Sequence, residues 1–482
     1  MKNTYPRLRI PIGFLSLLLV LVGCNKEPMI TTHSPEALRL YGEGVSKWQK
    51  FYYKEAEESL KRAVALDSSF AMAWGRLAMV YGSSDNEAQA LEAIEKAVRY
   101  APQTSRREQL YVSLWNHRLR YHFRDAARVV DSLIALYPDE AEAYFSRGLL
   151  YDLDKRYDDA LRMYQKAIGT DSTFALAQMM LGYAYSNLGK NEEALEEMDR
   201  YVRLAPEAAD PRASYADLLM RVGRYDEALE QYQKALELKP DYWYAVRQIG
   251  EVYLTKGQLK KGRAELYRSL ELIPKNPQRV ASYKAIDGSV AMARGNFSEA
   301  TSYYREALTA DSLHWSAAFG IVRSLGELKQ FAEAASALDH VRRVLEYRNL
   351  AGSTMMLDFY VARAILLTEQ DSLEQATQYC DSALQYSAPL TRRAVYRAFA
   401  EIYRRQKNYE AALSACEEAL RINPAYPPAL LTLTRVYAES GDNVMTAEIA
   451  HRLLAIWKDA DPDYRYLIEI RRLLRQSRPP QT

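Results

Sequence analysis

The chain has little of what a β-sheet protein or a nucleic-acid-binding protein needs. Only 20 of its 482 residues are glycine, and no stretch alternates apolar and polar residues as a half-buried strand does. The net charge is +2, and it falls to about −1 (2 − 3) if Lys2, Arg7 and Arg9 are removed with a leader segment. A nearly neutral body gives no electrostatic basis for nucleic-acid binding. The many Ala, Leu, Glu and Arg residues favour helices instead.

Common catalytic motifs are also missing. The sequence contains no G-x-x-x-x-G-K-[ST], G-x-S-x-G, H-E-x-x-H or G-x-G-x-x-G, which excludes the usual phosphate-binding and nucleophile motifs. His117 and His122 lie five residues apart on what we expect to be one helix. Two metal ligands on one helix face need a spacing of three or four. We therefore expect no metal site, no cofactor, no small-molecule substrate and no enzymatic activity.

Long hydrophobic runs are rare, and the clearest one lies at the N-terminus. Lys2, Arg7 and Arg9 form a basic segment, and the apolar residues 10–23 follow it. A run of this length is too short to span a bilayer, which takes about 20 residues, so the pattern indicates a signal peptide over residues 1–23. The segment ends in Leu21-Val22-Gly23-Cys24, which resembles the lipobox of bacterial lipoproteins.

The lipobox resemblance implies cleavage before Cys24, with a diacylglycerol on its sulfur and a fatty-acyl chain such as palmitate on the new amine. Several acyl chains hold a protein stably at a membrane. The mature chain would then lie in the bacterial cell envelope, with the outer membrane facing the periplasm favoured over the inner membrane. Residues 24–36 contain two prolines and no periodicity, so they are expected to form a short tether. An ordinary secretory signal peptide is the alternative.

A repeat of about 34 residues organises the rest of the chain. Residues 209–242 show one copy, in which apolar residues at spacings of three and four mark two short helices. Val222-Gly223-Arg224 separates the two helices, and Pro240 ends the second. One hairpin cannot bury both of its apolar faces, so the copies must stack. An alanine in the second helix marks the copies: Ala56, Ala90, Ala126, Ala160, Ala194, Ala228, Ala300, Ala334, Ala376 and Ala412.

This pattern resembles the tetratricopeptide repeat (TPR), whose first helix carries Leu-Gly and Tyr as in Leu181, Gly182 and Tyr185. The resemblance implies an all-α superhelix, or TPR solenoid, of about twelve helix-turn-helix repeats. We expect repeats 1–9 over residues 37–348, a loop insertion at 349–356, repeats 10–12 over 357–462, and a capping helix and tail at 463–482. Four extra residues, 277–280, separate repeats 7 and 8. Binding of acidic lipid by the arginines of the last segment is an alternative to a capping role.

Cysteine is scarce, and the two residues within the repeats occupy corresponding positions. Cys380 and Cys416 fall in the second helices of consecutive repeats. Neighbouring helices pack about 8–10 Å apart, whereas a disulfide tolerates a Cα separation of only about 7 Å. We therefore expect two small buried hydrophobic side chains rather than a disulfide.

The TPR resemblance also implies that the second, fifth, ninth and twelfth residues of each first helix face a concave groove. In repeats 2–5 these positions are rich in aromatic residues and Met, and in repeats 7–11 they are charged. Aromatic residues, Met and Arg are enriched in protein interfaces, so the groove is predicted to bind a protein or peptide partner. The predicted groove residues are Met72, Met79, Tyr111, Trp115, Phe145, Leu149, Met179, Tyr183, Arg247, Glu251, Arg323, Arg397, Glu401 and Arg404.

The sequence therefore favours a lipid-anchored scaffold for protein–protein interaction in the cell envelope. Two alternatives stay open. One is an envelope glycan-binding lipoprotein, although the chain lacks the long insertions that build the sugar sites of starch-binding lipoproteins with such repeats. The other is an accessory factor for outer-membrane assembly, a pilus or a secretion machinery.

Overall fold

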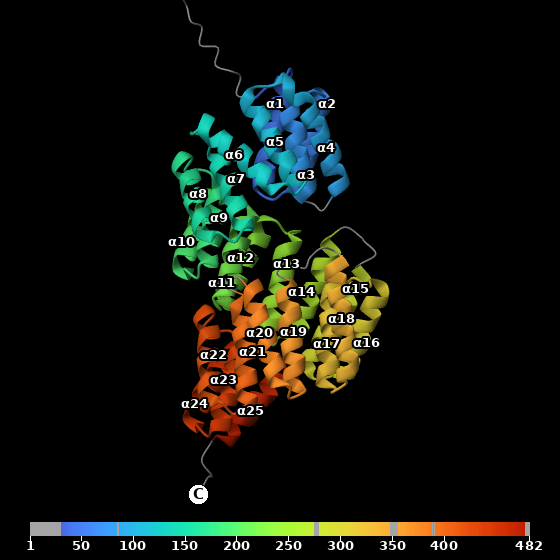
Figure 1. Cartoon of the computed structure of the whole chain (residues 1–482), viewed down its shortest axis with the longest axis vertical. Coiled ribbons are helices and arrows are strands. Elements are labelled where there is room, and N and C mark those ends of the chain that lie inside the picture. Colours follow the sequence, from blue (N-terminus) through green and yellow to red (C-terminus); the bar gives the residue numbers. More distant parts are fainter. Residues whose placement is uncertain are drawn as a thin grey trace, which may run out of the picture.

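The computed structural model describes residues 30–83, 86–273, 279–347, 355–387, 389 and 391–477, and every regular element within them is a helix (Figure 1). The all-α superhelix predicted from the repeats is confirmed. The predicted signal peptide, Cys24 and the start of the tether lie outside the described residues, as do residues 349–354 of the predicted insertion. None of the described helices combines the length and the apolar character needed to cross a membrane.

Successive helices pair into antiparallel hairpins, one hairpin per repeat, and a single helix follows the last hairpin. The first six hairpins consist of α1 (Pro35–Gln49) and α2 (Tyr53–Leu66), α3 (Ala71–Ser83) and α4 (Glu87–Tyr100), α5 (Arg106–Leu119) and α6 (Phe123–Leu136), α7 (Ala141–Leu153) and α8 (Tyr157–Thr170), α9 (Ala175–Asn187) and α10 (Asn191–Leu204), and α11 (Ala209–Arg221) and α12 (Tyr225–Leu238). A short 3₁₀ turn, η1 (Ala101–Gln103), connects α4 to α5.

The second half repeats this arrangement. It consists of α13 (Trp243–Thr255) and α14 (Leu259–Leu272), α15 (Arg279–Arg294) and α16 (Phe297–Ala310), α17 (Trp315–Glu327) and α18 (Phe331–Tyr347), α19 (Met355–Glu369) and α20 (Leu373–Tyr386), α21 (Arg392–Arg405) and α22 (Tyr409–Ile422), α23 (Pro427–Ser440) and α24 (Asn443–Ile456), and finally α25 (Arg465–Gln476). Because α19 already begins at Met355, the predicted insertion ends two residues too late.

A buried alanine and a larger buried side chain one turn later lie in the core of the hairpins, as in Ala56 with Leu60 and Ala160 with Tyr164. In the hairpin of α11 and α12, Ala216, Ala228 and Tyr232 are fully buried. Burying such an aromatic side chain contributes roughly 1.5–3 kcal/mol. Tyr164 and Tyr304 occupy the same position in two other repeats, and residues such as Leu60, Ile94 and Cys380 fill it elsewhere. Cys380 and Cys416 are free, fully buried thiols, as the sequence predicts.

The superhelix is wound tightly enough for its successive turns to touch. Near the N-terminus, the turn between α1 and α2 packs against the loops that lead into α11 and α13. The Tyr52 hydroxyl accepts a hydrogen bond from the Ala209 amide at 3.3 Å, and Lys239 pairs with Glu55 at 3.1 Å. These contacts join residues more than 150 positions apart and close the first superhelical turn.

The C-terminal hairpins pack in the same way against the middle of the chain (Figure 1). The Tyr225 hydroxyl donates to the Ala425 carbonyl at 3.0 Å, and the Trp457 indole donates to the Thr255 carbonyl at 3.1 Å. At Gly223, a left-handed φ of +86° and the closeness of Asn423 leave no room for a larger residue. Helix α25 follows α24, packs on α23 and also reaches α15. Two ion pairs complete this contact: Arg294 with Asp463 at 2.8 Å, and Arg465 with Glu327 at 2.6 Å.

Candidate partner-binding surface

The predicted aromatic and Met part of the concave groove is mostly core. Met72, Tyr111, Trp115, Phe145 and Met179 are all buried, with Tyr111 and Trp115 only 1% exposed. Three more of the predicted residues are half-buried: Met79, Leu149 and Tyr183. The expectation that this stretch is an open surface is therefore wrong for the five buried side chains, because the groove is filled by the protein itself.

Arg76 explains why the groove is filled there. Its guanidinium lies 4.6 Å from the centroid of the Trp115 ring and 4.9 Å from that of Trp48, and it pairs with Glu142 at 2.9 Å. The side chain is 2% exposed. A cation placed between two indole rings and a carboxylate is strongly held when water is excluded. Sequence reasoning missed Arg76, although its place within the otherwise apolar sequence of α3 is a usable signal.

The next stretch of the concave side is a network of tyrosines around two carboxylates, the buried Asp210 and the half-buried Asp217. The hydroxyls of Tyr201 and Tyr242 donate to Asp210 at 3.0 and 2.9 Å, and those of Tyr232 and Tyr244 donate to Asp217. Burial raises the pKa of Asp210 to about 6, although the hydrogen bonds from the tyrosines oppose this shift. The network joins α10 to α13, so these carboxylates serve packing rather than a partner.

Two residues of the predicted charged part of the groove, Glu401 and Arg404, are paired within the chain. Arg404 bonds to both Glu401 and Glu439, and Arg435 pairs with Glu469 at 2.7 Å. Burial alone would raise the pKa of Glu401, but its hydrogen bond with Arg404 and the neighbouring arginines hold that pKa below its usual value. Of the remaining predicted residues, Glu251 and Arg397 are half-buried, whereas Arg247 and Arg323 are exposed.

Arg323 lines a pocket of about 140 Å³ that the C-terminal segment helps to close. The pocket lies between the first helices of repeats 7 to 9, and Tyr464 and Tyr466 form one side of it. Its other lining residues are Leu254, Leu259, Ser289, Met292, Ala293 and Tyr304. At this volume the pocket accepts one side chain rather than a peptide segment, so the concave side of repeats 7–9 is also nearly filled.

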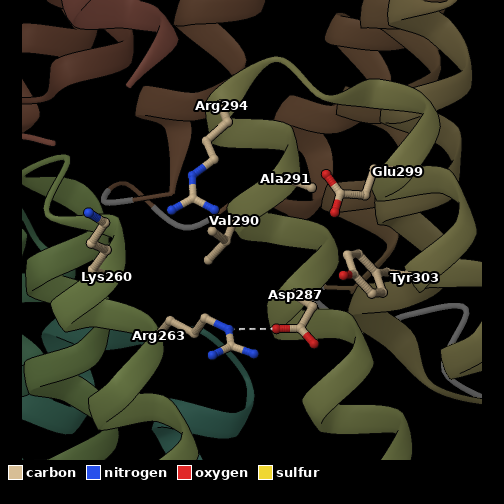
Figure 2. Close-up of a pocket in the computed structure, with 8 residues that line it drawn as sticks. All are labelled: Lys260, Arg263, Asp287, Val290, Ala291, Arg294, Glu299 and Tyr303. Atoms are coloured by element: carbon tan, nitrogen blue, oxygen red, sulfur yellow. Dashed lines mark hydrogen bonds and ion pairs between the residues drawn. The ribbon is translucent and has the colours of Figure 1, made fainter. Parts of the chain in front are cut away.

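A larger cleft of about 300 Å³ lies between α14 and the pair α15 and α16 (Figure 2). Lys260 and Arg263 stand on one wall, and Asp287 and Arg294 stand on the other (Figure 2). Arg263 donates to Asp287 at 2.7 Å across the opening. The remaining lining residues are Val290, Ala291, Glu299 and Tyr303. Arg263 pairs with Asp287 and Arg294 pairs with Asp463, so Lys260 is the one cation of this lining without an ion pair among the described residues.

The cleft coincides with a break in the repeat. Helix α15 has 16 residues where the corresponding helix α13 has 13, and the last two of the four extra residues, Arg279 and Val280, are its first two residues. A repeat shifted away from its neighbour leaves a gap that side chains of ordinary length do not fill. The sequence shows the break, but the cationic lining comes from two repeats and was not predicted.

The two histidines that the sequence analysis set aside lie close together. Helix α5 ends at Leu119 and α6 begins at Phe123, so His122 lies in the turn between the two helices and the spacing argument against a metal site does not apply. His117, His122 and Asp125 offer ligand atoms that lie within 4.8 Å of one another. Their arrangement is the one candidate metal-ligand group among the described residues.

Comparisons with known proteins agree with the repeat pattern. Models of the tetratricopeptide repeat match residues 71–104, 122–173, 153–218, 288–351 and 403–468, and a TPR repeat model matches residues 216–277. No curated protein matches the chain significantly.

The solved structures that match include MamA and the APC/C hetero-tetramer Cut9-Hcn1. MamA is 24% identical, covers 33% of this chain and 93% of its own, and gives a TM-score of 0.30. The APC/C hetero-tetramer Cut9-Hcn1 is 16% identical, covers 92% of this chain and 97% of its own, and gives a TM-score of 0.31. Both TM-scores lie below 0.5, so neither structure supports an assignment of function. The matched family models and the stacked hairpins identify the chain as a member of the tetratricopeptide-repeat family.

Proposed function

We propose that this TPR protein is a non-enzymatic, lipid-anchored scaffold of the bacterial cell envelope that binds a protein partner. The observation that carries the proposal is the self-filled concave groove beside an open cationic cleft. The five buried side chains of repeats 2–5 are not available to a partner, so we infer that the partner uses another surface. The cleft between α14 and α15 offers such a surface, and it suits an acidic segment of a protein.

The anchor is supported by the sequence Leu21-Val22-Gly23-Cys24 and by the short distance from Cys24 to the folded body. Thr31 donates to the buried Glu108 side chain from its amide at 2.8 Å and from its hydroxyl at 2.6 Å. Its chain neighbour Thr32 donates to Asp67 at 2.6 Å. Only residues 25–29 separate Cys24 from Ile30, where the described chain begins, and a fully extended chain of that length spans roughly 20 Å at most. The N-terminal repeats would therefore lie close to the membrane surface, with the outer membrane facing the periplasm favoured.

Two properties of the cleft support it as the site for the partner: the charge of its lining residues and their exposure to solvent. Lys260 and Arg263 are exposed. Arg263 is already engaged in a hydrogen bond to Asp287. The Lys260 side chain extends from α14 beside the opening (Figure 2). An acidic side chain or the C-terminal carboxylate of a partner could pair with Lys260, whereas Arg294 is already paired with Asp463 at 2.8 Å. Charge complementarity of this kind guides association and sets the register of a complex.

In-cell crosslinking tests this proposal with matched variants. The full-length chain and its Lys260→Glu variant are crosslinked in the bacterium, extracted in detergent and analysed by mass spectrometry. We expect a protein that is captured by the wild type and by Lys54→Glu, an exposed charge reversal on α2, but that is lost with Lys260→Glu. Equal capture by both variants would refute the cleft as the site. Binding to a glycan array without any crosslinked protein would favour the glycan-binding alternative.

Membrane attachment is tested separately. Cys24→Ala removes the only acylation site that the lipobox implies, so the variant should move from the membrane fraction to the soluble periplasmic fraction. Persistent sedimentation of Cys24→Ala with membranes would overturn the anchor.

A further inference from the structure

We propose that His117, His122 and Asp125 form a binding site for a divalent transition-metal ion, with Zn²⁺ as the best fit. The site lies at the turn of the third hairpin and is independent of the partner-binding cleft. His117 belongs to the last turns of α5, His122 is the residue that precedes α6, and Asp125 lies in the first turn of α6.

The backbone holds the three residues in place. The chain reverses through Tyr121, which has a left-handed φ of 60°. The His122 amide donates to the His117 carbonyl at 2.8 Å, and the Asp125 amide donates to the His122 carbonyl at 3.1 Å. The two imidazole rings lie with their centroids 6.0 Å apart. The turn therefore fixes the backbone positions from which the three side chains extend.

The ligand atoms are near the spacing that a metal ion needs. They lie within 4.8 Å of one another, and ligands of tetrahedral zinc, at about 2.0–2.1 Å from the metal, are roughly 3.3 Å apart. Small rotations of the exposed His122 side chain and of the Asp125 side chain would shorten the distances between the ligand atoms to the value that zinc requires. In addition, Nδ1 of His117 is buried and has no hydrogen-bond partner among the described residues. A buried polar atom without a partner is costly, and coordination at this ring is one way to offset that cost.

The donor set selects the class of metal. Two imidazole nitrogens and one carboxylate oxygen suit Zn²⁺, and they also bind Co²⁺ and Ni²⁺, whereas Ca²⁺ and Mg²⁺ prefer oxygen ligands. Three protein ligands leave a fourth position for water or for a ligand from another molecule. A metal ion there would link α5 to α6 directly and stabilise the third hairpin.

The surrounding arginines do not block the site. Arg128 pairs with Asp125 at 3.2 Å, but its side chain is 79% exposed, so this ion pair is weak and easily displaced. Arg120 is engaged by Glu95 at 3.1 Å, and Arg118 interacts with Glu142 of the next repeat. The remaining neighbour, Arg124, is exposed at the start of α6 and free to extend into solvent.

Cobalt titration tests the site directly. The full-length chain is produced as Cys24→Ala with an affinity tag that contains no histidine, so that neither the tag nor the lipidation thiol binds metal. We expect one equivalent of Co²⁺ to give a visible absorption band, and Zn²⁺ to displace it. Zn²⁺ should also raise the unfolding temperature.

Three single substitutions locate the metal. His122→Ala and Asp125→Asn change accessible side chains, and each should weaken binding at least about 100-fold, since loss of even an outer-sphere partner costs 10–100-fold. His451→Ala removes an exposed histidine on α24 and should bind like the parent protein. Circular dichroism checks that each variant is folded. Binding that survives both His122→Ala and Asp125→Asn would overturn the proposal, as would the absence of binding at micromolar Co²⁺ and Zn²⁺.

Discussion

Replacing Gly223 with alanine tests whether contact between successive superhelical turns holds the fold closed. A Cβ at Gly223 would lie 2.5 Å from Oδ1 of Asn423 and 2.6 Å from Cβ of Ala425. Gly189 occupies the same turn of the preceding repeat with a φ of +78°, but nothing lies within 4 Å of its Cβ position. Alanine at either site costs about 1–2 kcal/mol for the left-handed backbone. Only Gly223→Ala adds an overlap with a distant loop, which costs a further 1–3 kcal/mol, roughly.

Two measurements separate these contributions. If the contact stays closed, urea unfolding should show Gly223→Ala to be less stable than Gly189→Ala by the cost of the overlap. If the contact between Gly223 and Asn423 opens instead, the overlap disappears and the superhelix becomes more extended. Small-angle X-ray scattering detects opening as a larger radius of gyration for Gly223→Ala and an unchanged one for Gly189→Ala. If the two variants lose the same stability and scatter alike, the contact between Gly223 and Asn423 does not close the superhelix, and the reasoning fails.

Three other changes probe the buried groups. Trp115→Ala should lower the free energy of unfolding by about 3–5 kcal/mol, measured by urea unfolding, because the ring is core; an unchanged midpoint would make it surface. Since burial raises the pKa of Asp210 to about 6, the folded chain binds more protons than the unfolded chain between about pH 4 and pH 6. Its stability should therefore fall as pH rises through that window, by roughly 3 kcal/mol at most, and unfolding curves of Asp210→Asn should lack this slope. Burial also raises the pKa of Cys380 and of Cys416 to about 12, so a thiol reagent at about pH 8 should label them only as fast as the chain unfolds; rapid labelling of the native protein would contradict their burial.

The hairpins are predictable because each follows from a local pattern. Ala228 and Tyr232 lie one helical turn apart and face the same neighbour, and Pro240 ends the helix that they occupy. The contact between Gly223 and Asn423 is not local. It joins residues 200 positions apart and depends on the sum of small rotations between many repeats, which no single repeat encodes.

The candidate sites are less predictable for the same reason. The position of Trp115 in its repeat identifies the concave face, but whether that face is open depends on the curvature of the superhelix and on Arg76 from the preceding repeat. His117 and His122 fail a spacing rule that assumes one continuous helix. The helix ends at Leu119, and the turn brings the two rings together. In both cases the position of a residue within its repeat does not determine which side chains surround it.

Departures from the repeat are therefore better guides to function than the repeat itself. A regular hairpin presents its apolar surface to its neighbours, which cover it, and its concave side is filled here by its own side chains. Where the spacing between repeats changes, part of the surface of one repeat is not covered by the next repeat. The cleft at α15 follows four extra residues, and the group of His117, His122 and Asp125 lies where the alanine spacing is 36 rather than 34, from Ala90 to Ala126. Both proposed sites thus arise where the chain breaks its own period, and that is where substitutions should alter binding without unfolding the solenoid.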